Sequence, residues 1–150
     1  MTVVFCDLDD LLDDVNNKNE YGVLYSGFAT TATNLCPTGY RVSTRNDWET
    51  LKTYAGGTFV AGGKLKEAGT AHWLSSNSPG TDNYGFSAVG SGYISNLGAV
   101  GYLKERGYYW TSTAATNNNN WLYVFNYIWA NLDFNNLSKD YGLPVRCIKN

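Results

Sequence analysis

One stretch of the sequence, residues 107–147, constrains the fold of this chain more than any other. It opens with an aromatic and hydroxyl-rich run, YYWTST, and closes with the compact run GLPVRC. Between these ends, eight asparagines are interleaved with large apolar side chains over residues 117–136. Successive side chains of a β-strand point to opposite faces, so this mixture predicts strands with two different faces. We therefore expect the two ends to be scaffold and residues 114–136 to carry a binding surface.

Composition indicates one globular domain. The chain has 150 residues, of which 43% are hydrophobic and 16% are charged, and this is enough to bury a sizeable core. The net charge of -2 argues against nucleic acid as a partner, because phosphate binding needs a basic surface. No apolar run approaches the roughly 18 residues of a membrane span, so we expect no membrane insertion. We divide the chain into an acidic N-terminal segment or linker, residues 1–20, and a ligand-binding domain, residues 21–150.

Residues 1–20 allow two interpretations. An apolar run followed by DLDDLLDD matches the nucleophile loop of the haloacid dehalogenase phosphatases, with Asp7 as nucleophile and Asp9 as general acid. That chemistry also needs a downstream lysine and acidic metal ligands, and the later sequence does not show this pattern. The alternative is a short acidic helix that docks through its leucines, or a linker from an upstream module. The start lacks the basic and apolar regions of a signal peptide, so we expect a piece of a longer protein or a route other than general secretion.

Local signals predict two helical segments and several short strands. Ser43 or Thr44 caps the first helix, with Asp47 in its first turn, and a glycine pair ends it. A weaker helical or irregular segment follows at residues 62–68. Residues 69–107 are rich in Gly, Ser and Asn and predict long loops held by aromatic side chains. Strands are predicted at residues 21–28, 40–42, 108–111, 121–128, 131–134 and 144–148, with shorter aromatic strands around 72–73, 84–86 and 92–94.

Five motifs carry a resemblance to a known family. They are NLCPTGYRVSTRNDWETL, AGGKLKEAGTAHW, NYGFSAVGSGY, GYYWTST and KDYGLPVRCIK, and they cover about residues 34–149. In this order and at this spacing, the chain resembles the Fibrobacter succinogenes major paralogous domain, a bacterial and phage surface module. It departs from the family at Tyr40 and Arg41, where Trp and His are usual, and at Ser43, where Pro is usual. The resemblance implies an α+β, C-type-lectin-like fold with one or two helices, a small antiparallel sheet and long Gly/Asn-rich loops.

The resemblance also implies a set of structural residues. It makes Cys36 and Cys147 neighbours and leaves Cys6 over. The pair forms a disulfide only if its Cα atoms lie roughly 4.4–6.8 Å apart, and in a reducing cell the two would be buried thiols. The residues expected to be structural are Cys36, Cys147, Trp48, Trp110, Trp121 and Arg146.

The sequence does not predict an enzyme. Its only histidine, His72, has no nucleophile near it, and its position in a motif favours a packing or hydrogen-bonding role. The formylglycine-generating enzymes, which are related to the family in architecture, use a cysteine pair in a much longer chain, so their activity is not carried over. Asp82 and Asn83 can ligate Ca²⁺ together with backbone carbonyls, although a turn is the simpler role. We expect no catalytic residue and no cofactor, with Ca²⁺ as the one alternative.

Residues 114–136 favour binding instead. Trp and Tyr supply rigid anchors and Asn supplies adaptable hydrogen bonds, a combination typical of antibody paratopes. If Trp121, Tyr123 and Phe125 face the core, the alternate residues, beginning with Leu122, face outwards and expose apolar surface. The positions predicted to contact a ligand are Ala114, Thr116, Asn118, Asn119, Leu122, Val124, Asn126, Ile128, Trp129, Asn131, Asp133 and Asn135.

The resemblance carries a further implication, because members of the family are among the targets of diversity-generating retroelements. These elements randomise adenines in a template rich in AAY (Asn) codons, which gives Leu, Val, Ile, Ala, Asp or Asn among others, but never Trp, Lys, Glu or Met. The pattern fits fixed residues, Trp121 and Trp129, interleaved with diversified ones. An Asn-rich loop region beside an ordinary sheet explains the same composition. The reachable positions are Leu122, Val124, Asn126, Ile128, Ala130 and Asp133.

Together these observations favour a non-enzymatic receptor-binding domain, diversified at the tip of a phage tail fibre, that recognises a protein or glycan on a bacterial surface. Its location would be the virion tail fibre, or the extracellular face of a bacterial cell. A bacterial adhesin or lipoprotein module is the main alternative, and a small enzyme of the formylglycine-generating kind is the more distant one. A homo-oligomeric parent would raise the avidity of a weakly binding domain.

Overall fold

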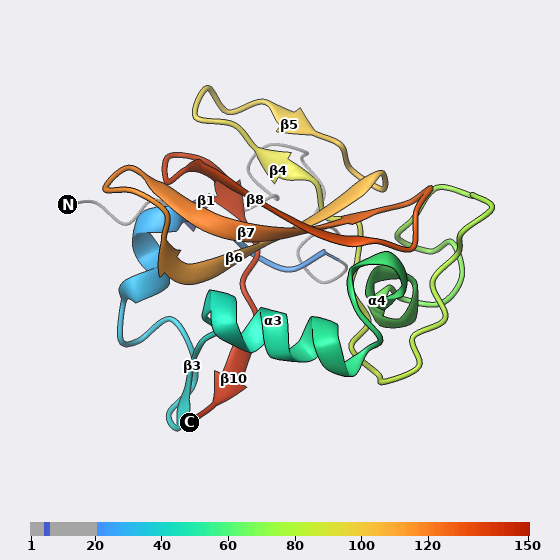
Figure 1. Cartoon of the computed structure of the whole chain (residues 1–150). Coiled ribbons are helices and arrows are strands. Elements are labelled where there is room, and N and C mark those ends of the chain that lie inside the picture. The colour runs from blue at the N-terminus through green and yellow to red at the C-terminus, as the bar shows by residue number, and fades with distance from the viewer. Residues whose placement is uncertain (1–4, 7–20) are drawn as a thin grey trace.

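The computed structural model of the protein describes residues 5–6 and 21–150. Within these residues lie two α-helices and three antiparallel sheets, so the fold is of the predicted α+β class (Figure 1). The two interpretations of the acidic segment, a nucleophile loop at Asp7 and Asp9 or a docking helix, fall outside the described residues. None of the helices in the described part of the chain is both long and apolar enough to cross a membrane.

The three sheets differ in size. The largest has the strand order β1-β2-β9-β4-β5, a second has the order β6-β7-β8, and the smallest pairs β3 with β10. β7 is therefore the central strand of the three-stranded sheet, and β8 is one of its edges. The strands are β1 (Phe5–Cys6), β2 (Leu24–Ser26), β3 (Tyr40–Val42), β4 (Tyr93–Ile94), β5 (Val100–Gly101), β6 (Arg106–Ala114), β7 (Asn119–Asn126), β8 (Leu132–Ser138), β9 (Gly142–Leu143) and β10 (Cys147–Lys149).

Two helices lie against one face of the three-stranded sheet (Figure 1). α3 (Arg45–Tyr54) begins with the predicted capping box, in which the Thr44 hydroxyl accepts from the N–H of Asp47 and the Asp47 carboxylate accepts from the N–H of Thr44. α4 (Thr58–Leu65) begins directly after the glycine pair rather than at residue 62. The pair separates two helices because Gly57 adopts a φ of 91°, which side-chain-bearing residues avoid.

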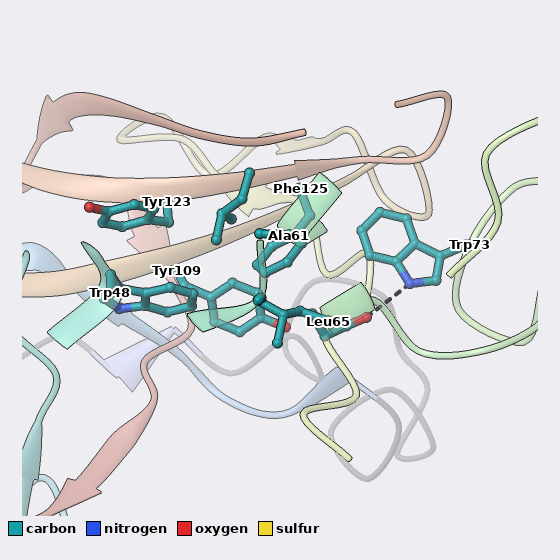
Figure 2. Packing of buried hydrophobic residues seen from close by; sticks show 10 residues of the cluster. Trp48, Ala61, Leu65, Trp73, Tyr109, Tyr123 and Phe125 are labelled. Atoms are coloured by element: carbon teal, nitrogen blue, oxygen red, sulfur yellow. Dashed lines mark hydrogen bonds between the residues drawn. The ribbon is translucent and has the colours of Figure 1, made fainter. Parts of the chain in front are cut away.

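The largest core fills the space between these helices and the sheet (Figure 2). Trp48 of α3 stacks on Tyr123 of β7, with ring centroids 5.0 Å apart and an interplanar angle of 10°. Phe125, which is fully buried, continues the row towards Ala61 and Leu65 of α4. Burial of each large apolar side chain stabilises the fold by roughly 1.5–3 kcal/mol. The predicted inward direction of Tyr123 and Phe125 is confirmed.

The opposite face of the same sheet is also covered, and this corrects one prediction. Leu122 is 2% exposed and packs with Tyr108, Trp110 and Leu143. Val124 is partly buried against the same cluster. The predicted exposure of Leu122 is wrong, and Val124 is only partly exposed, because Leu143 of β9 adds a layer on the face that strand alternation alone left open.

Cys36 and Cys147 form a disulfide, as the resemblance implied, with Cα atoms 5.8 Å apart. The bond joins the segment before β3 to the first residue of β10, across a sequence separation of 111 residues. The two strands also pair directly, with Cys147 opposite Val42. A crosslink over so long a loop typically stabilises a fold by roughly 2–5 kcal/mol. Both cysteines are therefore part of the frame.

Some predicted strands are turns. Of residues 21–28, only three form a strand, β2, which leads into a 3-10 helix, η1 (Gly27–Thr31). Neither residues 72–73 nor residues 84–86 form a strand. Short-range side-chain hydrogen bonds shape the second of these segments, as when the Asp82 carboxylate accepts from the N–H of Ser87 at 2.8 Å.

Candidate binding surface

Most of the predicted contact residues are accessible, but they do not form one patch. β7 is eight residues long, or roughly 23 Å at about 3.3 Å per residue. It separates the β6–β7 loop (residues 115–118) from the β7–β8 turn (residues 127–131), which lie at opposite ends of the sheet (Figure 1). The exposed positions are Ala114, Thr116, Asn118, Ile128, Trp129, Asp133 and Asn135, and the partly exposed ones are Asn119, Val124, Asn126 and Asn131.

A buried lysine holds the β7–β8 turn in place. Lys66 is 1% exposed, and its ammonium donates to the carbonyl oxygens of Ser78, Asn126 and Trp129 at 2.8, 2.8 and 2.9 Å. Burial lowers the pKa of this ammonium to about 8, because desolvation disfavours its charged form. Ile128 and Trp129, 45% and 52% exposed, therefore project from a turn whose backbone is tied to the core.

The β6–β7 loop is held by its own polar side chains. The Thr116 hydroxyl accepts from the N–H groups of Asn118 and Asn119, at 3.3 and 3.0 Å. Asn120, which is 2% exposed, donates its side-chain amide to the Gly27 carbonyl at 3.0 Å. The asparagines of this region thus divide into a buried anchor and exposed neighbours.

The edge strand β8 presents residues 133–136 to solvent. Because side chains alternate along a strand, Asp133 and Asn135 lie on one face of the sheet, and Phe134 and Asn136 lie on the other. In register, Phe134 lies opposite Tyr123, and Asn136 lies opposite Trp121. Phe134 and Asn136 are therefore on the face that carries the Trp48 stack, beyond the end of the core.

A cluster that sequence analysis missed lies on this part of the face. We name it the Arg45 surface, and it consists of Arg45, Trp121, Phe134, Asn119 and Asn136. The Arg45 Cζ lies 4.1 Å from the centroid of the Trp121 ring and 4.8 Å from that of Phe134. The two rings meet edge to face at 5.8 Å. The Asn119 amide donates to the Oδ1 of Asn136 at 2.9 Å.

Arg45 differs from Arg41 and Arg146 in that no carboxylate or backbone carbonyl among the described residues accepts from its guanidinium. Arg41 pairs with a carboxylate, and this hydrogen bond holds the pKa of Asp47 well below its usual value. Arg106 donates to a tyrosine hydroxyl and Arg146 to a backbone carbonyl. The Arg45 guanidinium instead lies beside the Tyr123 hydroxyl, whose own proton is donated to the Glu49 carboxylate. Its one signal in the sequence is its place in the first turn of a predicted helix, where the helix dipole disfavours a cation.

The tryptophans show the same division between frame and surface. Trp48 and Trp110 are buried, and their indole N–H groups donate to the Ser43 hydroxyl and the Tyr25 carbonyl. In the part of the chain that the structure describes, the indole N–H groups of Trp121 and Trp129 have no acceptor. Trp121, predicted to be structural, is thus also part of an accessible surface.

Residues considered for catalysis or metal binding have structural partners. The His72 Nδ1 lies 2.8 Å from the Glu67 carboxylate, and its ring meets Tyr21 edge-on. Both carboxylate oxygens of Asp82 accept from Ser87, one from its N–H at 2.8 Å and one from its hydroxyl at 2.5 Å. Among residues 21–150, no group of three or more His, Cys, Asp or Glu side chains is placed to hold a metal ion.

Comparison with known proteins agrees with the resemblance carried by the motifs. The family model described as the Fibrobacter succinogenes major domain matches residues 9–149. The match includes the disulfide-linked frame, the β7–β8 turn and the whole Arg45 surface. No curated protein and no solved structure matches the chain.

Proposed function

The chain belongs to the Fibrobacter succinogenes major domain family, and from that premise we propose that it is a non-enzymatic domain that binds a molecule on a bacterial surface. In this proposal its α+β fold is C-type-lectin-like, with a rigid frame that carries an adaptable surface. The Cys36–Cys147 disulfide and the capped helix α3 support such a frame. The disulfide also leaves no free cysteine pair within residues 21–150 for chemistry of the formylglycine-generating kind.

The observation that carries the proposal is the exposure of three large apolar side chains on a fixed backbone. Trp129 is 52% exposed, Phe134 is 46% exposed and Ile128 is 45% exposed. None of the three is part of a buried cluster. Aromatic side chains of this kind are favoured anchors in interfaces, because they bury a large area and have few rotamers to lose. A pre-formed turn and strand lower the entropy lost on binding.

We propose a phage tail fibre as the parent protein, with several copies of the domain at its tip. A small, open surface supports modest affinity, and several copies on one fibre would compensate through avidity. A bacterial adhesin or lipoprotein module is the second candidate. The surrounding DNA distinguishes the two candidates. Tail-assembly genes beside the gene for this chain would support the fibre, and a lipoprotein signal encoded upstream would support the adhesin.

The exposed positions also suit diversification by a retroelement. Ile128 and Asp133 are exposed, and Asn126 and Ala130 are partly exposed. Leu122 is not suited, because any replacement there alters the core. The DNA tests this part of the proposal. It requires that the Asn codons of residues 117–136 are mostly AAY and that a near-identical template lies close to the gene, and the absence of either overturns it.

The function itself is tested by the binding of a fluorescent, tetramerised domain to a panel of bacterial strains in flow cytometry. We expect binding to a subset of strains, and a loss of roughly tenfold or more when Trp129→Ala and Phe134→Ala are combined. Leu97→Ala is the matched control, because it removes an apolar side chain that is 90% exposed on the β4–β5 loop. Binding to no strain, or an equal loss in the control, contradicts the proposal.

A further inference from the structure

We propose that the Arg45 surface binds the carboxylate of an acidic glycan, such as a polymer that contains hexuronic acid. This inference rests on the proposed function and names the class of ligand. The first observation that supports it is the set of protein groups around the Arg45 guanidinium. The planar face of Arg45 is occupied by the rings of Trp121 and Phe134, while the Tyr123 hydroxyl lies near its N–H edge and can accept from only one of its five N–H groups. A guanidinium edge matches a carboxylate in shape, through two parallel hydrogen bonds.

The charges around Arg45 leave the surface positive. Glu49 lies one helical turn along α3, but its carboxylate pairs with Lys52 at 2.7 Å and also accepts from the Tyr123 hydroxyl. The Lys52 ammonium lies 5.4 Å from the centroid of the Phe134 ring. The Glu49 carboxylate also interacts with the charge of Arg45, so Arg45, Lys52 and Glu49 together leave a net positive charge on this surface. The position of Arg45 at the start of α3 adds to this, because the helix dipole is positive there.

The remaining groups of the surface suit a sugar. A sugar ring packs its C–H face on an aromatic side chain and directs its hydroxyls to polar groups at the rim. Phe134 is 46% exposed, the Trp121 indole N–H has no acceptor among residues 21–150, and the Asn119–Asn136 pair keeps one amide N–H₂ and one carbonyl oxygen for hydroxyl groups. Apolar contact with a few directed polar groups is the usual chemistry of small-molecule recognition.

Two other possibilities fit the structure less well. The tyrosine cluster around Tyr93 also has a stacked arginine, but the Arg106 guanidinium lies over one ring, that of Tyr102, whereas that of Arg45 lies over two. An acidic peptide added as a strand along β8 would need the backbone N–H groups of that edge. The N–H of Asn136 already donates to the Oδ1 of Asn135 at 2.8 Å, which opposes strand addition there.

The experiment measures the binding of four probes by isothermal titration calorimetry. They are trigalacturonate, its neutral methyl ester, a sulfated oligosaccharide of similar length and an oligo-aspartate of similar charge. We expect trigalacturonate to bind roughly tenfold or more tightly than each of the others, because only it combines a carboxylate with a sugar ring. We expect Arg45→Gln to remove this preference and Arg45→Lys to keep only part of it, since an ammonium lacks the fork geometry.

The matched control is Lys149→Gln, which removes the same charge from an exposed position on β10. It should leave the affinity for trigalacturonate unchanged, and thermal melts should show all variants folded. Equal binding of the methyl ester, tighter binding of the sulfated sugar or of oligo-aspartate, or full affinity in Arg45→Gln overturns the inference, as does no binding of trigalacturonate. Cell binding by Arg45→Gln at the wild-type level refutes this inference alone, whereas a wild type that binds no cells refutes the proposed function.

Discussion

β7 and β8 are neighbours in one sheet and similar in composition, yet their side chains have opposite roles. In β7, NNWLYVFN, four residues from Asn120 to Phe125 are buried, with α3 and α4 on one face and β9 on the other, whereas β8, LDFNNLS, is covered at one end and exposed over residues 133–136. Their residues lie directly opposite each other, so buried Leu122 faces exposed Asn135. Position in the sheet, rather than residue type, decides which strand is frame and which is surface.

The largest expected difference in stability is between substitutions at Leu122 and at Asn135, which lie opposite each other. Leu122→Ala should lower the free energy of unfolding by roughly 2–5 kcal/mol, because it leaves a cavity between the sheet and Leu143. Asn135→Ala, on the neighbouring strand, should change it by no more than about 0.5 kcal/mol. Urea unfolding measures both. Equal effects would show that β8 is as structural as β7.

A second contrast tests how α4 fixes the turn that joins the strands. A Cβ at Gly62 would lie 2.0 Å from the Asn131 carbonyl oxygen, so Gly62→Ala forces the helix and the turn apart. We expect a loss of roughly 1–3 kcal/mol. At Gly63 the nearest atom is the Ala130 Cβ, at 3.2 Å, and Gly63→Ala should be tolerated better. Urea unfolding of the two variants decides, and a milder effect at Gly62 would contradict this packing.

Lys66 should also be needed to hold the turn. Lys66→Met leaves the carbonyls of Ser78, Asn126 and Trp129 without their donor, and we expect a loss of about 1–3 kcal/mol. The difference between wild type and variant should depend on pH. Burial lowers the pKa of Lys66 from 10.5 to about 8, so between these values the unfolded chain holds a proton that the folded chain does not.

Stability rises with pH wherever the unfolded chain binds more protons. The advantage of wild type over Lys66→Met should therefore grow as the pH is raised from 7.5 to 9.5. Chemical unfolding of both proteins at each pH provides the measurement, and the variant corrects for the tyrosines. An advantage that stays constant or shrinks would show that the ammonium is not desolvated as described.

The smallest effect on stability is expected at Asn136. Its side chain accepts one exposed hydrogen bond from Asn119, so Asn136→Ala should change the unfolding free energy by less than about 0.5 kcal/mol. The same variant should weaken binding to trigalacturonate several-fold, because the amide is part of the Arg45 surface. Calorimetric titration and urea unfolding of one preparation separate the two effects. A stability loss without a binding loss would make Asn136 part of the frame.

Local patterns predicted the local structure well. The capping box depends on Thr44 and Asp47, which lie within four residues of each other in the sequence. Strand alternation identified Tyr123 and Phe125 as inward-facing. Alternation states only that two faces differ, however, and not how many of them are covered. The second layer comes from β9, which is two residues long and has no periodicity to detect. Leu122 was for this reason assigned to the wrong environment.

The candidate surface could be predicted only in part for a similar reason. Strand alternation predicts that Ile128 faces outwards, and the residue is exposed, although it lies in the turn after β7 and not in a strand. The stacking of Arg45 on Trp121 and Phe134 joins a helix terminus to two strands far along the chain. No local pattern links such positions, and the only signal was a cation at the wrong end of a helix.

An alanine scan of residues 119–138 with two readouts per variant tests the division between frame and surface most directly. The readouts are the free energy of unfolding and binding to a bacterial strain that the wild type recognises. We predict that substitutions at the buried positions of β7 lower stability, whereas substitutions at Phe134 and the other exposed positions of β8 lower binding and leave stability nearly unchanged. Binding losses that simply follow stability losses along both strands would contradict it.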